Sequence, residues 1–223
     1  MPRLFSGPED RRIKRALCIV AHPDDIEFYC AGAILLMNRH GAAVDFVLAT
    51  SGDKGARDAS KSRAKVARIR EREQELAADV LGVKRVAFLR HPDAELVENL
   101  ELREELVHEI RTSKPDVILT FDPNVPYRLH PDHRVIGRVA LDAAWPSARD
   151  PLTFPKAGPP HETAEAWCFG GLEPTLEVDV EEVLGKKIEA RLAHASQTRS
   201  PASLMRRWRA TARVEKFHQV NLR

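Results

Sequence analysis

The feature that most constrains this chain is a repeated alternation of short apolar runs with longer stretches of helical periodicity. Four apolar runs predict buried strands, at 17–21, 44–50, 83–89 and 116–121. Helical patterns follow them at 26–40, 59–81, 99–112 and 131–144. Strands alternating with helices indicate right-handed crossovers and a mostly parallel sheet covered on both faces. We therefore expect an α/β fold, a Rossmann-like three-layer sandwich.

The pattern changes after residue 145. A proline-rich segment at 145–161 predicts a long ordered loop, which could form a substrate wall or be a tolerated surface insertion. Two short strands, at 166–169 and 176–180, and two helices, at 181–194 and 202–217, are expected to finish the chain. We expect a single domain over 1–223, with a core of about 15–145 and C-terminal strands and helices at about 164–218.

Charge and composition exclude several classes of protein. The 35 Lys and Arg residues nearly balance the 33 Asp and Glu residues, giving a net charge of only +2. Such a balance argues against nucleic acid or an anionic membrane surface as a partner. The N-terminus has no apolar signal core and no run is long enough to span a membrane, so a cytoplasmic protein is expected. The arginine-bearing helical pattern at 203–217 could be a solvated face or a subunit contact, in which case the chain forms a homo-oligomer.

The cysteines carry no chemistry that the sequence can identify. Cys18, Cys30 and Cys168 are scattered and form no CxxC pair, which argues against a disulfide framework and against a thiolate zinc site. The chain also lacks a GxSxG nucleophile elbow and a GxGxxG dinucleotide fingerprint. Serine hydrolases and dinucleotide-dependent enzymes are therefore poor matches.

Two tetrapeptides stand out, HPDD at 22–25 and HPDH at 130–133. Each follows the carboxyl end of a predicted strand and precedes a helical pattern, so each resembles a strand-to-helix elbow with proline at the first helical position. A single HPDD could be no more than an N-capping turn. Because loops at the carboxyl ends of parallel strands line one crevice, two such elbows are expected to face each other.

The residue types in these elbows suit a catalytic zinc ion, which uses three protein ligands and a water molecule. We expect one Zn²⁺ on His22, Asp25 and His133. Asp24 is left free beside the metal, where a carboxylate could act as a general base. A third sequence, HPDA at 91–94, has alanine at its fourth position, so His91 is interpreted as non-ligating.

These motifs resemble those of the PIG-L/LmbE-like zinc N-deacetylases, and the resemblance extends over most of the chain. AHPDDIEF at 21–28 and HPDHR at 130–134 are similar to the two zinc motifs of the family. TSGDKG at 50–55, the RxxE helix from Arg70, and a late K…HxSQ segment from Lys187 to Gln197 add weaker matches. The chain departs from the family where Ile26 separates Asp25 from Glu27 and where Ala31-Gly32-Ala33 replaces a common Gly-Gly-Thr.

The resemblance implies removal of an N-acetyl group from an amino sugar of small-molecule size, with release of acetate. It implies zinc on His22, Asp25 and His133, and Asp24 as the base. It further implies that His130 stabilises the oxyanion or protonates the leaving amine, and that Asp132 orients His130. Asp24 returning its proton is the alternative donor to the amine, and the sequence leaves this open.

Other residues have two interpretations each. Arg70 is expected near the sugar, or in a surface salt bridge with a nearby glutamate. Asp93 could face the substrate crevice or cap a helix. His194 could lie near the site or at a helix end, and His218 could reach a neighbouring subunit or be a surface residue. Rival functions are hydrolysis of another amide or an ester, and sugar binding without catalysis.

Overall fold

The computed structural model describes residues 13–56 and 60–223, and its strands form one seven-stranded sheet in the order β3-β2-β1-β4-β5-β7-β6. The strands are β1 (Arg15–Val20), β2 (Ala43–Thr50), β3 (Arg85–His91), β4 (Val117–Phe121), β5 (Glu165–Phe169), β6 (Leu176–Asp179) and β7 (Val214–Asn221). The five strands from β3 to β5 pair in parallel, whereas β7 pairs antiparallel with β5 and β6. The expected mostly parallel α/β sheet is confirmed.

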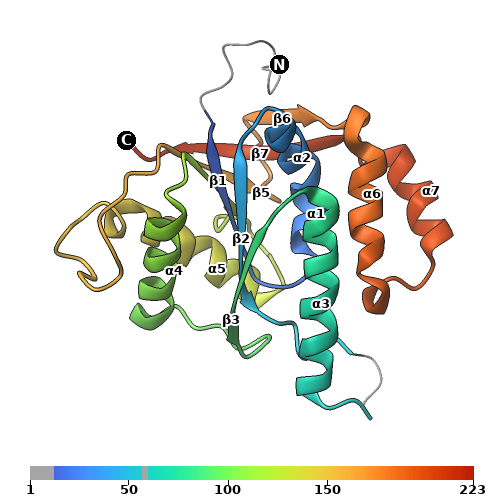
Figure 1. Ribbon diagram of the computed structural model, residues 1–223, viewed down its shortest axis with the longest axis horizontal. Coiled ribbons are helices and arrows are strands. Elements are labelled where there is room, and N and C mark those ends of the chain that lie inside the picture. The colour runs from blue at the N-terminus through green and yellow to red at the C-terminus, as the bar shows by residue number, and fades with distance from the viewer. Residues whose placement is uncertain (1–12, 57–59) are drawn as a thin grey trace.

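Helices cover both faces of this sheet, which Figure 1 shows nearly edge-on. They are α1 (Asp25–Tyr29), α2 (Ala31–Arg39), α3 (Arg63–Leu81), α4 (Leu100–Ser113), α5 (Pro131–Asp142), α6 (Leu184–Ala193) and α7 (Pro201–Thr211). Helices α4 and α5 lie on one face, and α1, α2, α3, α6 and α7 lie on the other (Figure 1). Every residue of β4 and all but the first of β1 are buried, as expected for central strands. No described helix is long and apolar enough to cross a bilayer.

Most expected elements appear within a few residues of their predicted bounds. The pattern at 26–40 forms two helices rather than one, because Cys30 adopts a non-helical conformation with φ −144° and ψ 5°. The helix expected from residue 59 begins at Arg63 as far as the structure describes it; residue 59 itself and the N-terminal residues 1–12 lie outside the described part.

The predicted C-terminal helix at 202–217 is wrong in its second half. Helix α7 ends at Thr211, and the chain then forms β7, which inserts between β5 and β6. The strand alternates as a half-buried strand should, since Glu215 and Phe217 are buried while Val214 and Lys216 are exposed. Because the inward residue Glu215 is charged, the alternation cannot be recognised in the sequence. The helical pattern of the preceding arginine-rich segment was therefore extended too far.

The proline-rich segment at 145–161 lies at the amino edge of the sheet. Its end is held by His161, whose ring bonds to the carbonyl of Pro115, just before β4 begins. The guanidinium of Arg111, buried in α4, donates to carbonyls along the segment, those of Ser147, Ala148, Asp150, Thr153, Phe154 and Gly158. The segment is therefore a tightly anchored cap on the amino edge, and the alternative that it walls a substrate site at the carboxyl edge is wrong.

Candidate metal centre

The two histidine elbows meet at the carboxyl edge of the sheet. Strand β1 leads directly into the first elbow, and β4 leads through the loop at 122–129 into the second. The chain runs from β1 outward to β2 and β3, then crosses back to β4 on the other side of β1. This reversal of strand order opens a crevice between the two loops, which is where ligands bind in open α/β sheets.

Potential ligand atoms of three residues converge between the elbows. His22 Nδ1 lies 3.2 Å from His133 Nε2, Asp25 Oδ2 lies 3.5 Å from His22 Nδ1, and Asp25 Oδ1 lies 3.1 Å from His133 Nε2. Ligands around a tetrahedral zinc, with bonds of about 2.0–2.2 Å, stand roughly 3.3–3.5 Å apart. The spacing of these three side chains therefore fits a single divalent cation.

Two further groupings of potential ligands share His22. Among the described residues, His22–His130–His133 and His22–Asp93–Asp132 each bring three such atoms within 4.8 Å of one another. The second group uses the other ring nitrogen of His22. Its two carboxylates also accept backbone N–H groups, from Lys54, Ala94 and Leu96. Because these two carboxylates are already bonded to backbone N–H groups and to Nε2 of His22, they are suited to support His22 rather than to bind a metal. We therefore favour a cation at Nδ1 of His22.

The electrostatics of the cluster also call for a cation. Burial lowers the pKa of His22, but hydrogen bonds to Asp132, Asp25 and Asp93 outweigh it and raise that pKa to about 11. Burial of Asp25 is likewise outweighed by His133 and His22, which hold its pKa far below the usual range. The imidazolium of His22 thus carries the positive charge among three carboxylates, and a bound dication would take over that role.

Zinc binding is accordingly expected to release about one proton per ion at pH 7–8, because Nδ1 of His22 must lose its proton to become a ligand. With the pKa of His22 raised to about 11, affinity should rise about tenfold for each pH unit over this range. Calorimetric titration in two buffers of different ionisation enthalpy measures the proton directly. Binding that released no proton would contradict this account of His22.

Asp132 and Asp93 support His22 from behind. Asp132 Oδ2 lies 3.0 Å and Asp93 Oδ1 3.2 Å from His22 Nε2. Asp132 was expected to orient His130, and the structure pairs it with His22 instead. Asp93 is not the cap of α4, since Asn99 holds that position, and its expected place facing the substrate crevice stays a prediction. A carboxylate on the non-ligating nitrogen fixes a histidine's tautomer and strengthens it as a ligand.

Replacing Asp132 by asparagine is expected to weaken zinc affinity by about 10–100-fold, the usual effect of losing such a partner. The carboxylate also accepts the N–H of Ala94, a residue in the left-handed region at φ 62°, and an amide oxygen can retain that bond. Competition with a chromophoric chelator measures the affinity. Asp53→Asn is the control, because this carboxylate lies at the same edge and bonds to Arg63 and the backbone N–H of Asp93 but makes no hydrogen bond or ion pair with His22. Equal affinities in the two variants would refute the supporting role.

Asp24 lies beside the proposed ligands in a strained backbone conformation. Its φ of 92° is left-handed, which is unusual for a residue other than glycine and is often found at functional sites. Burial raises the pKa of Asp24 to about 6, against the opposing effects of Arg70, His194 and Arg191. A carboxyl group with a pKa near 6 can accept and return a proton near neutral pH.

His130 presents an uncharged imidazole to the same space. Its ring lies 4.5 Å from that of His22 and 4.7 Å from that of His133. Burial lowers its pKa, and the neighbouring rings of His22 and His133 lower it further. Nδ1 of His130 is buried and finds no hydrogen-bond partner among the described residues, which is uncommon for a buried polar atom.

Arg70 lies beside Asp24 and not on the surface. The side chain is buried, and its guanidinium donates to the carbonyls of Gly52 and Pro23 and to Asp24 Oδ1. The alternative of a surface salt bridge with a glutamate is therefore wrong, and the expected place near the sugar stays a prediction. The guanidinium fills the space beside Gly52, where a Cβ atom would stand 2.1 Å from Nη1. Arg70 thus joins the two loops and contacts the carboxylate of Asp24.

A buried polar chain behind Asp24 escaped the sequence analysis. The N–H of Asp24 donates to Gln74, whose amide donates to Glu27, and Glu27 Oε2 lies 3.1 Å from His194 Nε2. Gln74, Glu27 and His194 are each 0% exposed. One signal could have pointed to this chain, since three polar residues, Arg70, Glu73 and Gln74, interrupt the apolar stripe of α3.

The late HxSQ segment, at residues 194–197, supports the structure and belongs in part to this buried polar chain. His194 pairs with Glu27 inside the protein, Ser196 bonds twice to Glu73 of α3, and Gln197 donates to the carbonyl of Gly55. Outside the site, His91 pairs with Glu105 at 2.5 Å, as a non-ligating residue should. His218 lies on β7 with its Nδ1 2.8 Å from the carbonyl oxygen of Glu173.

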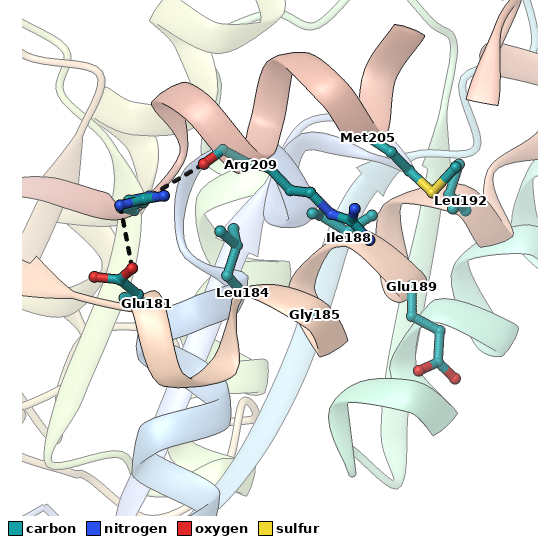
Figure 2. Close-up of a pocket in the computed structure, with 9 residues that line it drawn as sticks. Glu181, Leu184, Gly185, Ile188, Glu189, Leu192, Met205 and Arg209 are labelled. Atoms are coloured by element: carbon teal, nitrogen blue, oxygen red, sulfur yellow. Dashed lines mark hydrogen bonds and ion pairs between the residues drawn. The ribbon is translucent and has the colours of Figure 1, made fainter. Parts of the chain in front are cut away.

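A separate groove between α6 and α7 lacks this chemistry. Figure 2 shows its apolar floor, which includes Leu184, Ile188, Leu192 and Met205. Arg213, which also lines the groove, is paired with Glu181 at 3.1 Å. The nine lining residues include no histidine or cysteine, so the groove offers neither a metal centre nor a nucleophile.

Comparison with known proteins agrees with this geometry. Residues 17–144 match the family described as PIG-L, GlcNAc-PI de-N-acetylase. The chain is 33% identical to the diacetylchitobiose deacetylase of Thermococcus kodakarensis, over 83% of this chain and 70% of that protein. It is 27% identical to a probable N-acetyl-alpha-D-glucosaminyl L-malate deacetylase 2 of Bacillus anthracis, over 87% of this chain and 86% of that protein. The solved structure of N,N'-diacetylchitobiose deacetylase from Pyrococcus horikoshii superimposes with a TM-score of 0.87 at 28% sequence identity. The match covers 95% of this chain and 85% of that one.

Proposed function

Because this chain belongs to the PIG-L family of de-N-acetylases, we propose that it is a zinc-dependent hydrolase that removes the N-acetyl group from a small molecule containing N-acetylglucosamine and releases acetate. The observation that carries the proposal is the convergence of His22, Asp25 and His133 within 3.1–3.5 Å, with Asp24 beside them. Residues from 15 to 221 contribute strands to the one sheet, which supports treating the chain as one domain.

His22, Asp25 and His133 would hold the metal, which when bound polarises the acetyl carbonyl and acidifies water. Asp24 is the base that takes a proton from the attacking water, since its raised pKa of about 6 suits proton exchange near neutral pH. His130 donates a hydrogen bond to the oxygen that becomes negative as the amide carbon turns tetrahedral.

The leaving amine must gain a proton as the C–N bond breaks. The lowered pKa of His130 keeps its ring neutral at pH 7, so the ring can donate a hydrogen bond but has no proton to give as a general acid. Asp24, protonated by the first step, is therefore the proton source that the electrostatics favour. We assign both proton transfers to Asp24 and the oxyanion contact to His130.

The test is acetate release from diacetylchitobiose and from N-acetylglucosaminyl malate, a neutral and an anionic substrate. The purified protein is stripped with chelator, assayed, and assayed again after addition of Zn²⁺. We expect release only in the reloaded protein, and none from His133→Ala. No release from either sugar by the reloaded protein, together with cleavage of a simple acetyl ester, would favour the rival ester hydrolase.

A further inference from the structure

The carboxylate of Asp24 lies between two buried arginines from different helices. Arg70 of α3 places Nη2 3.3 Å from Oδ1, and Arg191 of α6 places Nη2 3.7 Å from Oδ2. The exposed fractions of the two arginines are 5% and 3%. Each carboxylate oxygen therefore faces its own guanidinium.

Arg191 is itself held in place from two sides. Its Nη1 donates to Thr198 Oγ1 at 2.9 Å, and Thr198 in turn bonds to the carbonyl of His194. On the other side the guanidinium carbon lies 4.6 Å from the centre of the Phe28 ring, a cation–π contact. A long side chain anchored in this way has little freedom, so its positive charge stays beside the Asp24 carboxylate.

We propose that Arg191 is a positioning residue for the general base, a role that rests on the proposed function. Arg70 alone contacts one oxygen, and a carboxylate held by one oxygen can still turn about its Cβ–Cγ bond. A second cation at Oδ2 fixes the plane of the carboxylate. Asp24 needs this restraint because its backbone is strained and a carboxylate with only 17% of its side chain exposed is unfavourable as an anion without nearby cations.

A second interpretation is that Arg191 only fastens α6 to its surroundings through Thr198 and Phe28. The two roles differ in what the conservative variant does. Lysine keeps the positive charge near Asp24 but lacks the planar fork that joins Thr198 and the aromatic face. Rescue by lysine therefore supports positioning of the carboxylate, whereas a purely structural role is not restored by charge alone.

The experiment compares Arg191→Met and Arg191→Lys with the wild type, and uses Arg207→Met, on the exposed face of α7, as the control. In the zinc-loaded methionine variant we expect kcat for acetate release to fall about 10–100-fold, as misplacement of a catalytic group by about 1 Å does. KM should change less than about twofold, and lysine should restore most of kcat. An unchanged kcat, a change in KM alone, or a lysine variant as slow as methionine would overturn the proposal.

A crystal structure of the Arg191→Met protein decides the positioning without any assay. We expect the Asp24 carboxylate to be rotated or split between orientations, with the backbone of α6 unmoved. An Asp24 side chain that kept its wild-type orientation would overturn the proposal even if the enzyme were slow. An inactive wild type would instead refute the proposed function, and the crystallographic result would still stand on its own.

Discussion

Asp24→Asn is expected to lower kcat by about 10²–10⁴-fold while zinc stays bound, because an amide cannot take the proton of the attacking water. The three proposed ligands are untouched by the change, and the asparagine oxygen can still accept from Arg70. Steady-state acetate release and metal analysis of the same sample measure the two effects. Near-normal turnover in zinc-loaded Asp24→Asn would show that another group is the base.

The same substitution should stabilise the metal-free protein above pH 6. Burial raises the pKa of Asp24 to about 6 from 3.8 in the unfolded chain, so the folded state holds this proton more tightly. Stability from the protonated carboxyl is therefore present below pH 4 and is lost as the pH rises through 6. The difference of about two pKa units corresponds to about 3 kcal/mol at most, which the neutral asparagine would recover at pH 7–8.

Denaturant unfolding of chelator-treated protein at pH 4.5 and 7.5 tests this second effect. The increase in the free energy of unfolding caused by Asp24→Asn should be small at pH 4.5 and large at pH 7.5. Asp122→Asn is the matched control, since this carboxylate lies at the same sheet edge but accepts only within its own loop, from the N–H of Asn124. An increase in the free energy of unfolding of equal size at both values of pH would show that ionised Asp24 does not destabilise the folded protein.

The sequence predicted those parts of the site that depend on contiguous residues. His22 and Asp25 lie within one turn of chain, and His133 follows its strand through a similar elbow, so local spacing and the rule for open sheets were enough to predict that these three side chains meet. The parallel half of the sheet was predictable for the same reason, since continuous apolar runs mark its buried strands.

The supporting contacts were not predictable, because each joins residues that only the fold brings together. Asp132 comes from α5 but supports His22 after β1, and Asp93 joins it from the loop after β3. Neither sequence position differs locally from an ordinary helix-entry aspartate. Arg191 and Gln74 likewise look like residues of charged amphipathic helices, and only their burial against Asp24 shows what they do.

The C-terminal strand was missed because a buried ion pair replaces the apolar residue expected there. Glu215 of β7 is 3% exposed, and its carboxylate accepts from the N–H groups of Gly32 and Ala33 and from Lys187 Nζ, each at 2.8 Å. The pair connects β7 and α6 to the amino end of α2, directly behind the first elbow. An anion at this end is also favoured by the helix dipole.

Glu215→Leu is therefore expected to destabilise the protein by about 3–5 kcal/mol, the usual cost of leaving one buried charge without its partner. Lys187 is only 2% exposed and would lose its counter-ion, and two N–H groups of α2 would lose their acceptor. Equilibrium unfolding in urea measures the loss. Removing the exposed pair of Lys186 and Glu189, on the same helix, should change stability by less than about 1 kcal/mol.

The double variant Glu215→Leu with Lys187→Met separates the two contributions. If the unpaired ammonium dominates, the second substitution should recover much of the loss, since a buried ion pair can often be replaced by apolar side chains of similar volume. If the orphaned N–H groups of α2 dominate, the double variant will stay as unstable as the single one and Glu215→Gln, which keeps an acceptor, will be the milder change. A single variant that lost less than about 1 kcal/mol would show that β7 is held by its strand pairing alone.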